Sequence, residues 1–219
     1  MTILLILVAL LGGALQRAPE LQLNLVAAPP PPERPEYARR SGEGCANAEG
    51  PGDHSPKTPP FSVTLADTDR LAYEVPDTMS FNVIIENTSP APLVLGISRD
   101  SHVAPQTMRP CRVVPPGVHF GVALVAMRKA GPGAIIANAP GYYGSPDIGG
   151  TTPELKPGER VRVQLPAHLG WSAGPGMELV LTTDPQPVRI KAFVMIEGES
   201  LQAVYSDNAL EVQLSRRIQ

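Results

Sequence analysis

Charged residues are scarce in this chain of 219 amino acids. They make up 18% of the sequence, and 18 Lys and Arg against 21 Asp and Glu give a formal net charge of −3. Proteins that bind nucleic acid concentrate basic side chains to neutralise phosphates, and this chain has no basic excess. Its basic residues adjoin only in pairs, which is too few for a patch that binds anionic lipid. We therefore expect no nucleic-acid partner, and no membrane contact beyond an N-terminal segment.

The residue patterns of common enzymes are also missing. The chain has 4 His residues, and none stands in the His-Glu-x-x-His spacing of zinc proteases. The segment Gly144-Ser145-Pro146-Asp147 is not the Gly-x-Ser-x-Gly turn that presents a hydrolase nucleophile. No glycine-rich stretch opens a helix that would hold a phosphate group. We expect neither catalysis nor a cofactor.

One set of residues has the side-chain types that bind a soft metal. His102, Met108, Cys111 and His119 are the ligand types of copper sites on β-sandwich proteins. In blue-copper proteins these ligands stand close together near the chain end, whereas prolines separate them here. A copper-binding sandwich domain is therefore an alternative function, and scattered surface or core residues are the simpler explanation.

Cysteine is nearly absent, because Cys45 and Cys111 are the only two. In an exported chain they allow one disulfide, which would tie the N-terminal region to the folded domain and stabilise it by roughly 2–4 kcal/mol. Two unpaired thiols are the alternative. Neither residue belongs to a Cys-x-x-Cys pair, so we expect no zinc or redox role.

The N-terminal region is apolar but short. Residues 3–11 form an unbroken apolar run, too short for the roughly 20 residues that span a bilayer and typical of a signal-peptide core. We interpret residues 1–18 as a signal peptide or anchor and expect a secreted or periplasmic protein. No Lys or Arg precedes the run, and a buried first strand or helix of a cytosolic protein is the alternative. Small side chains allow cleavage after Ala14, Ala18, Ala27 or Ala28.

Proline and glycine, by contrast, are abundant, with 26 and 20 residues. They concentrate between residues 27 and 60, where large aliphatic side chains are absent and no core can form. The proline runs favour extended polyproline II geometry. We therefore predict a disordered, proline-rich linker over residues 19–60.

From residue 61 onward, short alternating apolar runs are separated by turn residues. This pattern predicts an all-β domain over residues 61–216, folded as an antiparallel immunoglobulin-like β-sandwich. A helix is the competing interpretation of residues 118–129, and residues 130–157 are expected to form a loop. Asn87-Thr88-Ser89 matches a glycosylation sequon, although a turn before Pro90 explains the same residues. The expected strands are residues 61–66, 71–75, 80–88, 92–98, 118–129, 159–165, 177–183, 188–198 and 208–214.

Three segments resemble immunoglobulin-like domains of exported bacterial proteins. They are FNVIIENTSPAPLVL, LKPGERVRVQL, and VRIKAFVMIEG with SDNALEVQL. Similar domains occur in adhesion-type proteins and in the BsuPI-type proteinase inhibitors. The resemblance implies the sandwich fold and makes proteinase inhibition an alternative function. Residues 99–154 are longer than such a domain needs, and the Cys–Trp–Cys framework of antibody domains is missing.

Three aromatic residues are the best candidates for partner contacts. Tyr142 and Tyr143 lie in the long predicted loop, and Trp171 is the single tryptophan. Loops at the end of a sandwich often bind partners, and tyrosines offer large contact area at low entropic cost. Alternatively, these rings pack onto the sandwich and cover its core. We expect a non-catalytic, extracytoplasmic interaction module that binds another protein or a surface component.

Overall fold

The chain forms β-strands throughout the part that the structure describes. No helix occurs among the described residues, so the predicted all-β class is confirmed. Accordingly, the described part offers no helix long and apolar enough to cross a bilayer. The computed structural model describes residues 20–27, 59–97, 102–103, 118–128, 131–140, 142–144, 154–172, 181–197 and 201–217.

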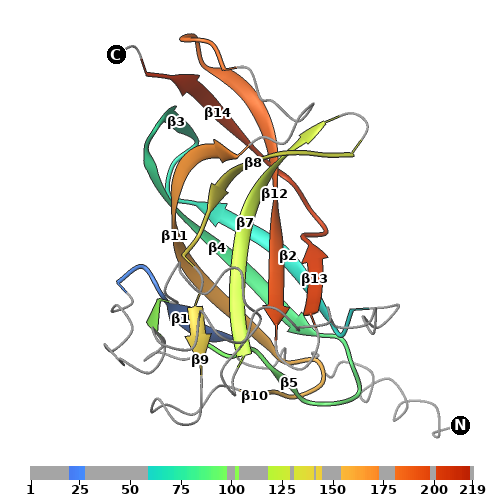
Figure 1. Cartoon of the computed structure of the whole chain (residues 1–219). Helices are drawn as coiled ribbons and strands as arrows, with labels where there is room; N and C mark the ends of the chain where they lie inside the picture. Colours follow the sequence, from blue (N-terminus) through green and yellow to red (C-terminus); the bar gives the residue numbers. More distant parts are fainter. Residues whose placement is uncertain are drawn as a thin grey trace, which may run out of the picture.

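Most strands belong to one large mixed sheet (Figure 1). Its strands are β1 (Leu21–Asn24), β2 (Phe61–Thr68), β3 (Ala72–Val75), β4 (Thr78–Asn87), β6 (His102–Val103), β7 (Val118–Arg128), β8 (Gly131–Asn138), β9 (Tyr142–Gly144), β11 (Arg160–Ser172), β12 (Gln186–Glu197), β13 (Leu201–Tyr205) and β14 (Leu210–Arg216). The main path runs β2-β4-β11-β8-β7-β12-β14-β3. Outside this path, β1 pairs with β11, β13 with β12, and β9 with both β6 and β7. A second, small sheet pairs β5 (Leu93–Val94) with β10 (Glu154–Leu155).

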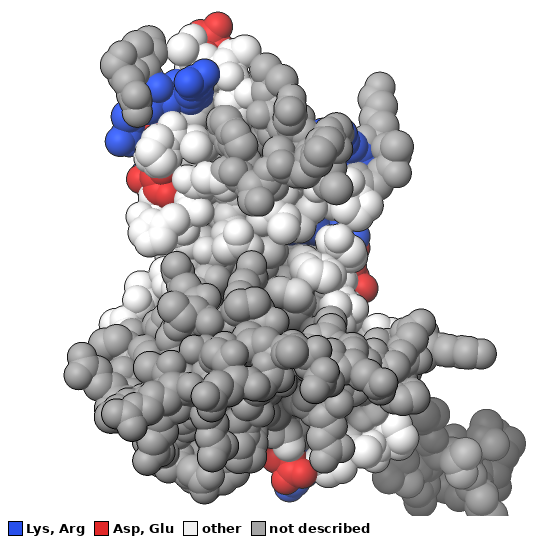
Figure 2. Space-filling view, in the orientation of Figure 1, with Lys and Arg blue, Asp and Glu red and all other residues white. Residues whose placement is uncertain are grey.

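The sheet differs from the predicted antiparallel sandwich. Two of its pairings, β1 with β11 and β14 with β3, are parallel. A sandwich of two stacked sheets is not confirmed either, because 12 strands form one continuous sheet. This sheet curls around its own core like a half-closed cylinder (Figure 1). On the face seen in Figure 2, the described surface is largely uncharged, as the composition implies.

Alternating side chains explain why these segments form strands with one buried face. In β2, Phe61, Val63 and Leu65 are buried while the residues between them are partly exposed. The same period of two runs along β12, from Val188 to Ile196. In β7, buried side chains occur on both faces, since neighbouring Leu124 and Val125 are both buried. These alternating residues form the single core that the sheet encloses.

The curl closes where residues 206–208 reach β2. Asp207 N donates a hydrogen bond to Val63 O over 2.8 Å. The side-chain amide of Asn208 then bonds both backbone groups of Leu65, accepting from its N at 2.9 Å and donating to its O at 2.8 Å. A strand neighbour would satisfy Leu65 in the same way, so Asn208 replaces a strand at this position.

The same three residues also stay attached to β12. Ser206 N donates to Ala192 O over 2.7 Å, and Ala192 N donates to Ser206 Oγ over 3.1 Å. Ser206 is fully buried, and its hydroxyl also donates to the backbone O of Asn208. We call residues 206–208 the closing segment, because they join β12 to β2.

Several predicted boundaries were wrong. The predicted loop 130–157 contains β8, β9 and β10, and the predicted linker 19–60 contains β1 at its start. β13 was not predicted, and residues 181–183 are not a strand. Gly131-Pro132-Gly133 belongs to the predicted loop, yet it lies in β8, which pairs with β7 through an irregular register. The leader 1–18, residues 28–58, Cys45 and Cys111 lie outside the described residues.

The closing segment predicts a specific loss of stability. Replacing Asn208 with Ala leaves both backbone groups of the buried Leu65 without their partner. We expect Asn208→Ala to lower the free energy of unfolding by about 1–3 kcal/mol, measured by urea denaturation. Asp207→Ala is the control, because the exposed residue contributes backbone hydrogen bonds only, and we expect a change within about 0.5 kcal/mol. Equal effects of the two substitutions would contradict the assigned role of Asn208.

β1 restricts where a leader peptidase could cut. Leu23 and Leu25 are 4% and 1% exposed, so cleavage after Ala27 or Ala28 would remove two core side chains. Cleavage after Ala14 or Ala18 would keep them. We expect intact-mass analysis of the exported protein to place its amino terminus at or before Glu20. A terminus at residue 28 or 29 would contradict this expectation.

Candidate functional site

The large sheet splits where β7 and β12 separate. The paired stretch begins with His119 opposite Glu197 and ends with Ala126 opposite Ile190. Beyond this point β7 continues with β8, and the first residues of β12 pair with β14. The split leaves an opening between two strands that are neighbours along the rest of their length.

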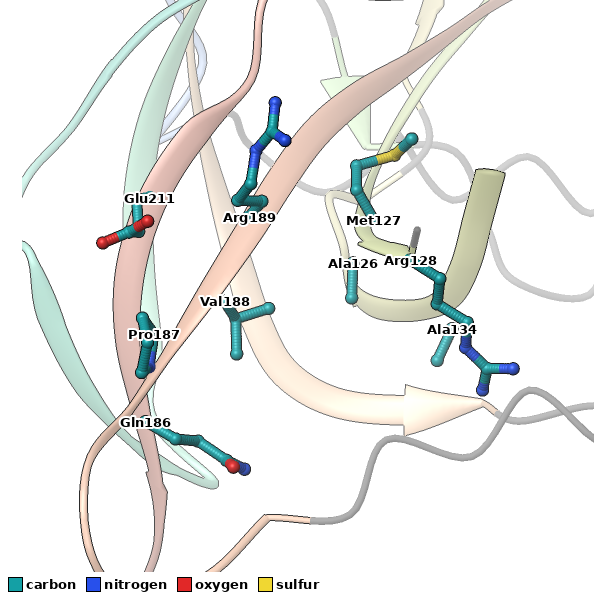
Figure 3. Close-up of a pocket in the computed structure, with 9 residues that line it drawn as sticks. All are labelled: Ala126, Met127, Arg128, Ala134, Gln186, Pro187, Val188, Arg189 and Glu211. Carbon is teal, nitrogen blue, oxygen red and sulfur yellow. The ribbon is translucent and has the colours of Figure 1, made fainter. Parts of the chain in front are cut away.

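A hollow of about 350 Å³ lies at this split (Figure 3). We call it the arginine hollow. Its apolar part includes the buried Ala126, Ala134 and Val188, and the exposed Arg128 and Arg189 lie beside it. The full lining consists of Ala126, Met127, Arg128, Ala134, Gln186, Pro187, Val188, Arg189 and Glu211.

The irregular register of β7 brings consecutive residues to the hollow. Its pairing with β8 shifts between Leu124 and Val125 and again between Val125 and Met127. Such bulges redirect side chains, which explains why residues 126, 127 and 128 all line one opening although strand neighbours normally alternate.

Gly133 positions Arg128 at the hollow. A Cβ atom at position 133 would lie 2.8 Å from Ala126 O and 3.0 Å from Arg128 Cγ. The Arg128 side chain therefore lies directly over the glycine, and a larger residue would displace it. The glycine is required by this close approach within a strand, whereas the sequence had indicated a turn.

Arg189 is the cation of the hollow that has no partner among the described residues. It stands opposite Glu211 in the pairing of β12 with β14, yet the two form no ion pair. Figure 3 shows the guanidinium of Arg189 and the carboxylate of Glu211 pointing in different directions. Arg189 can therefore bind an incoming carboxylate without first breaking an internal contact.

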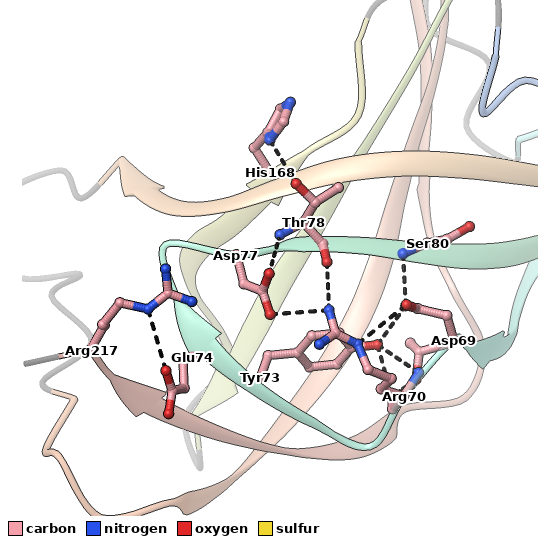
Figure 4. Close-up of polar contacts among 10 residues, drawn as sticks. Asp69, Arg70, Tyr73, Glu74, Asp77, Thr78, Ser80, His168 and Arg217 are labelled. Carbon is pink, nitrogen blue, oxygen red and sulfur yellow. Dashed lines mark hydrogen bonds and ion pairs between the residues drawn. The ribbon is translucent and has the colours of Figure 1, made fainter.

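Apart from the hollow, a cluster of polar side chains lies at the corner formed by β2, β3 and β4 (Figure 4). Asp69 Oδ1 accepts hydrogen bonds from Ser80 N at 2.7 Å and from the Tyr73 hydroxyl at 2.8 Å. The Arg70 guanidinium bonds Asp77 at 3.0 Å and lies 4.8 Å from the centroid of the Tyr73 ring. These contacts join residues of the same corner, so we assign the corner a structural role.

The corner changes the acidity of Asp69. Burial alone would raise its pKa, but hydrogen bonds from Ser80 and Tyr73 and the charge of Arg70 outweigh burial and lower the pKa below its ordinary value. Nearby, His168 Nδ1 lies 3.2 Å from Thr78 Oγ1 at the surface.

The structure separates the three predicted contact residues. Tyr142 is fully buried, its hydroxyl lies 3.3 Å from Leu25 O, and burial raises its pKa. It therefore packs in the core, which corrects its assignment as a contact residue and agrees with the alternative stated above. Tyr143 lies in β9 and Trp171 in β11, but their side chains lie outside the described part and their roles stay predictions. Tyr142 is not among the residues that line the arginine hollow.

No sequence pattern pointed to the arginine hollow. Arg128 and Arg189 look like ordinary charged residues near strand ends, and only the sheet register places both beside one hollow. The metal alternative stays a prediction, because Met108 and Cys111 lie outside the described residues. Within the described part, no three His, Cys, Asp or Glu residues lie together as metal ligands would.

The sequon residue Asn87 is buried, with 1% of its surface exposed. Its Nδ2 donates to Ala91 O and to Leu155 O, each at 2.8 Å, and its Oδ1 accepts from Ser89. A glycan would have to replace hydrogen on this nitrogen and break these contacts. The residues therefore form a turn, as the alternative interpretation held.

Comparison with known proteins adds no family. No family profile and no curated protein sequence matches this chain. Among solved structures, the alkylpurine DNA glycosylase AlkC of Pseudomonas fluorescens, bound to DNA containing an abasic site analog, is 10% identical with a TM-score of 0.31, covering 72% of this chain and 31% of that one. The β-glucosidase EmGH1 of Erythrobacter marinus is 13% identical with a TM-score of 0.28, covering 70% and 15%. A mutant β-glucosidase of Listeria innocua in complex with laminaribiose is 12% identical with a TM-score of 0.28, covering 86% and 21%.

This chain spans less than a third of the length of each of those three proteins. Their low scores carry no argument about its activity.

The corner around Asp69 predicts an acid-dependent loss of stability. Because the folded-state pKa is lowered, the contribution of Asp69 is present above the ordinary value of 3.8 and is lost as pH falls through the folded value. We expect Asp69→Asn to cost about 1 kcal/mol at pH 7, a modest value because the side chain is partly exposed. This difference from wild type should shrink as the pH falls below 3.8, measured by urea denaturation.

Glu74→Gln provides the control, since it removes an exposed ion pair with Arg217 in the same corner. We expect it to change the unfolding free energy by less than about 0.5 kcal/mol both at pH 7 and below pH 3.8. An Asp69→Asn variant as stable as wild type at pH 7 would show that the corner does not depend on this charge.

Proposed function

We propose that this protein is a non-catalytic interaction module that binds a partner through the arginine hollow. The observation that supports this proposal is the hollow of about 350 Å³, which combines a buried apolar part with two arginines. Its volume lies at the lower end of the roughly 300–1,000 Å³ range of ligand sites. The immunoglobulin-like assignment and the extracytoplasmic location belong to the same proposal and rest on the sequence patterns.

The lining favours a particular kind of partner. A guanidinium binds a carboxylate through two parallel hydrogen bonds, and the buried Ala126, Ala134 and Val188 favour an aliphatic side chain. The partner is therefore a protein segment in which a carboxylate adjoins an aliphatic residue. Among the described residues that line the hollow, none is a Ser, Cys, His or Lys that could act as a nucleophile or base.

A pair of peptides tests this function. The probe is Gly-Gly-Leu with a free carboxylate, and its C-terminal amide is the matched ligand control. We expect NMR titration to detect binding of the acid, with at least about tenfold weaker binding of the amide. We also expect Arg189→Ala to weaken binding of the acid by a similar factor, because the charged hydrogen bonds are lost. Exposed Arg189 has no described partner, so its substitution should leave the fold intact.

Lys156→Ala is the protein control. Lys156 is exposed in the turn between β10 and β11, and its removal changes the net charge by the same amount. We expect it to leave binding unchanged. Equal binding of acid and amide, or equal losses in both variants, would reject the hollow as a specific site.

A further inference from the structure

β1 is attached to the sheet on one side only. Its four residues pair in parallel with Val161–Gln164 of β11, and among the described strands β1 has no other partner. On its opposite side, this part of β11 pairs with β4. β8 pairs with β11 only from His168 onward, so β1 occupies the edge that β8 leaves uncovered.

Alternate side chains fix β1 on the core. Leu23 and Leu25 are buried, whereas Gln22 and Asn24, the neighbours of Leu23, are exposed. Beyond the last paired residue, Leu25 N donates to Gln164 O over 2.9 Å. The edge of β11 therefore holds an extended segment through backbone hydrogen bonds and two aliphatic side chains.

An acidic side chain precedes this pattern and contacts two arginines of β11. Glu20 Oε1 lies 2.9 Å from Arg162 Nε, and Glu20 Oε2 lies 3.4 Å from Arg160 Nη2. The hydrogen bond from Arg162 holds the pKa of Glu20 below its ordinary value, despite the opposing effect of burial. The ion pairs therefore fix the position of the segment along β11.

β1 does not use all the hydrogen-bonding capacity of these arginines. Arg160 Nε is buried and has no hydrogen-bond partner among the described residues. The Glu86 carboxylate lies 3.9 Å from it, beyond hydrogen-bond distance. Buried donors are nearly always paired in folded proteins, so a segment that also reaches Arg160 Nε would bind better than β1 does.

The connection between β1 and β2 allows β1 to leave. Residues 25–60, which are 36 in number, separate Asn24 from Phe61, so β1 can detach without moving β2. A strand that stays covalently joined to its own binding site remains at a high effective concentration after it detaches. A competing segment must therefore bind more tightly than β1 or arrive with other contacts.

We propose that the edge of β11 at Val161–Gln164 is a strand-binding site that β1 covers within the same chain. Its external occupant is an extended segment of a partner protein that runs parallel to β11 and replaces β1. The segment carries an acidic residue followed by aliphatic residues three and five positions later, as Glu20, Leu23 and Leu25 do. Strand addition of this kind obtains affinity from backbone hydrogen bonds and specificity from alternate side chains.

The test uses the full chain and a labelled peptide with the sequence of residues 19–27, PELQLNLVA. Leu23→Asp in the protein places a charge in the core position of β1 and weakens the internal strand. We expect the peptide to bind this variant at least tenfold more tightly than wild type, measured by fluorescence anisotropy. A peptide with Glu20→Lys and Leu23→Asp should not bind.

Leu71→Asp is the matched protein control. It makes the same exchange at a leucine that is 72% exposed and leaves β1 in place, so peptide binding should equal that of wild type. Equal binding to the Leu23→Asp variant and wild type, or no binding to either, overturns the proposal. A concentration-dependent dimer that the peptide dissociates would assign the site to a second copy and overturn the partner assignment.

Hydrogen exchange in the wild-type protein gives an answer even if Leu23→Asp prevents folding. We expect the Leu25 amide to exchange at least tenfold faster than amides between β4 and β11, because β1 detaches without global unfolding. Exchange of Leu25 at the same rate as those amides would show that β1 leaves only when the whole sheet unfolds. That result would overturn the proposal.

Discussion

The closure of the sheet depends on the side-chain amide of Asn208, which makes the two backbone hydrogen bonds that a neighbouring strand would make. Asn208 bonds both the N and the O of Leu65, and the residues before it remain bonded to β12. This arrangement connects one edge of the curled sheet to β2 over a stretch where no continuous ladder is present. A side chain can supply one donor and one acceptor at a chosen point, whereas a full strand would need matching length and register. This connection closes the curled sheet around its core.

Both proposed sites occur where strand pairing stops. The arginine hollow begins where the register of β7 and β12 ends, and the strand-binding site lies where β8 leaves β11 uncovered. Each place combines a strand edge that the neighbouring long strand does not cover, apolar side chains and arginine. An extended segment that carries a carboxylate could bind at either site. The arginine hollow would bind its charged group, and the edge of β11 would bind its backbone. The shared chemistry arises because a mixed sheet with strands of unequal length leaves gaps that its neighbours cannot fill.

The sequence was a good guide to strands and a poor one to their arrangement. Alternation correctly predicted β2, β4, β7, β11, β12 and β14, because each presents several apolar residues to one core. It missed β8, where Gly131-Pro132-Gly133 has turn composition, and β1, which lies just before the proline-rich stretch and within the predicted linker. The two parallel pairings join segments far apart in the chain, and no local pattern records them. For the same reason the hollow could not be predicted, since only the register places Arg128 and Arg189 beside one opening.

The parallel pairing of β14 with β3 has a consequence for the order of folding. β3 lies between β2 and β4 near the start of the domain, and its sheet partner is the last strand of the chain. The closing segment also follows β13, so neither β3 nor the free edge of β2 acquires its neighbour until residues 206–216 have been synthesised. Such non-local contacts delay completion of the sheet until these residues have left the ribosome.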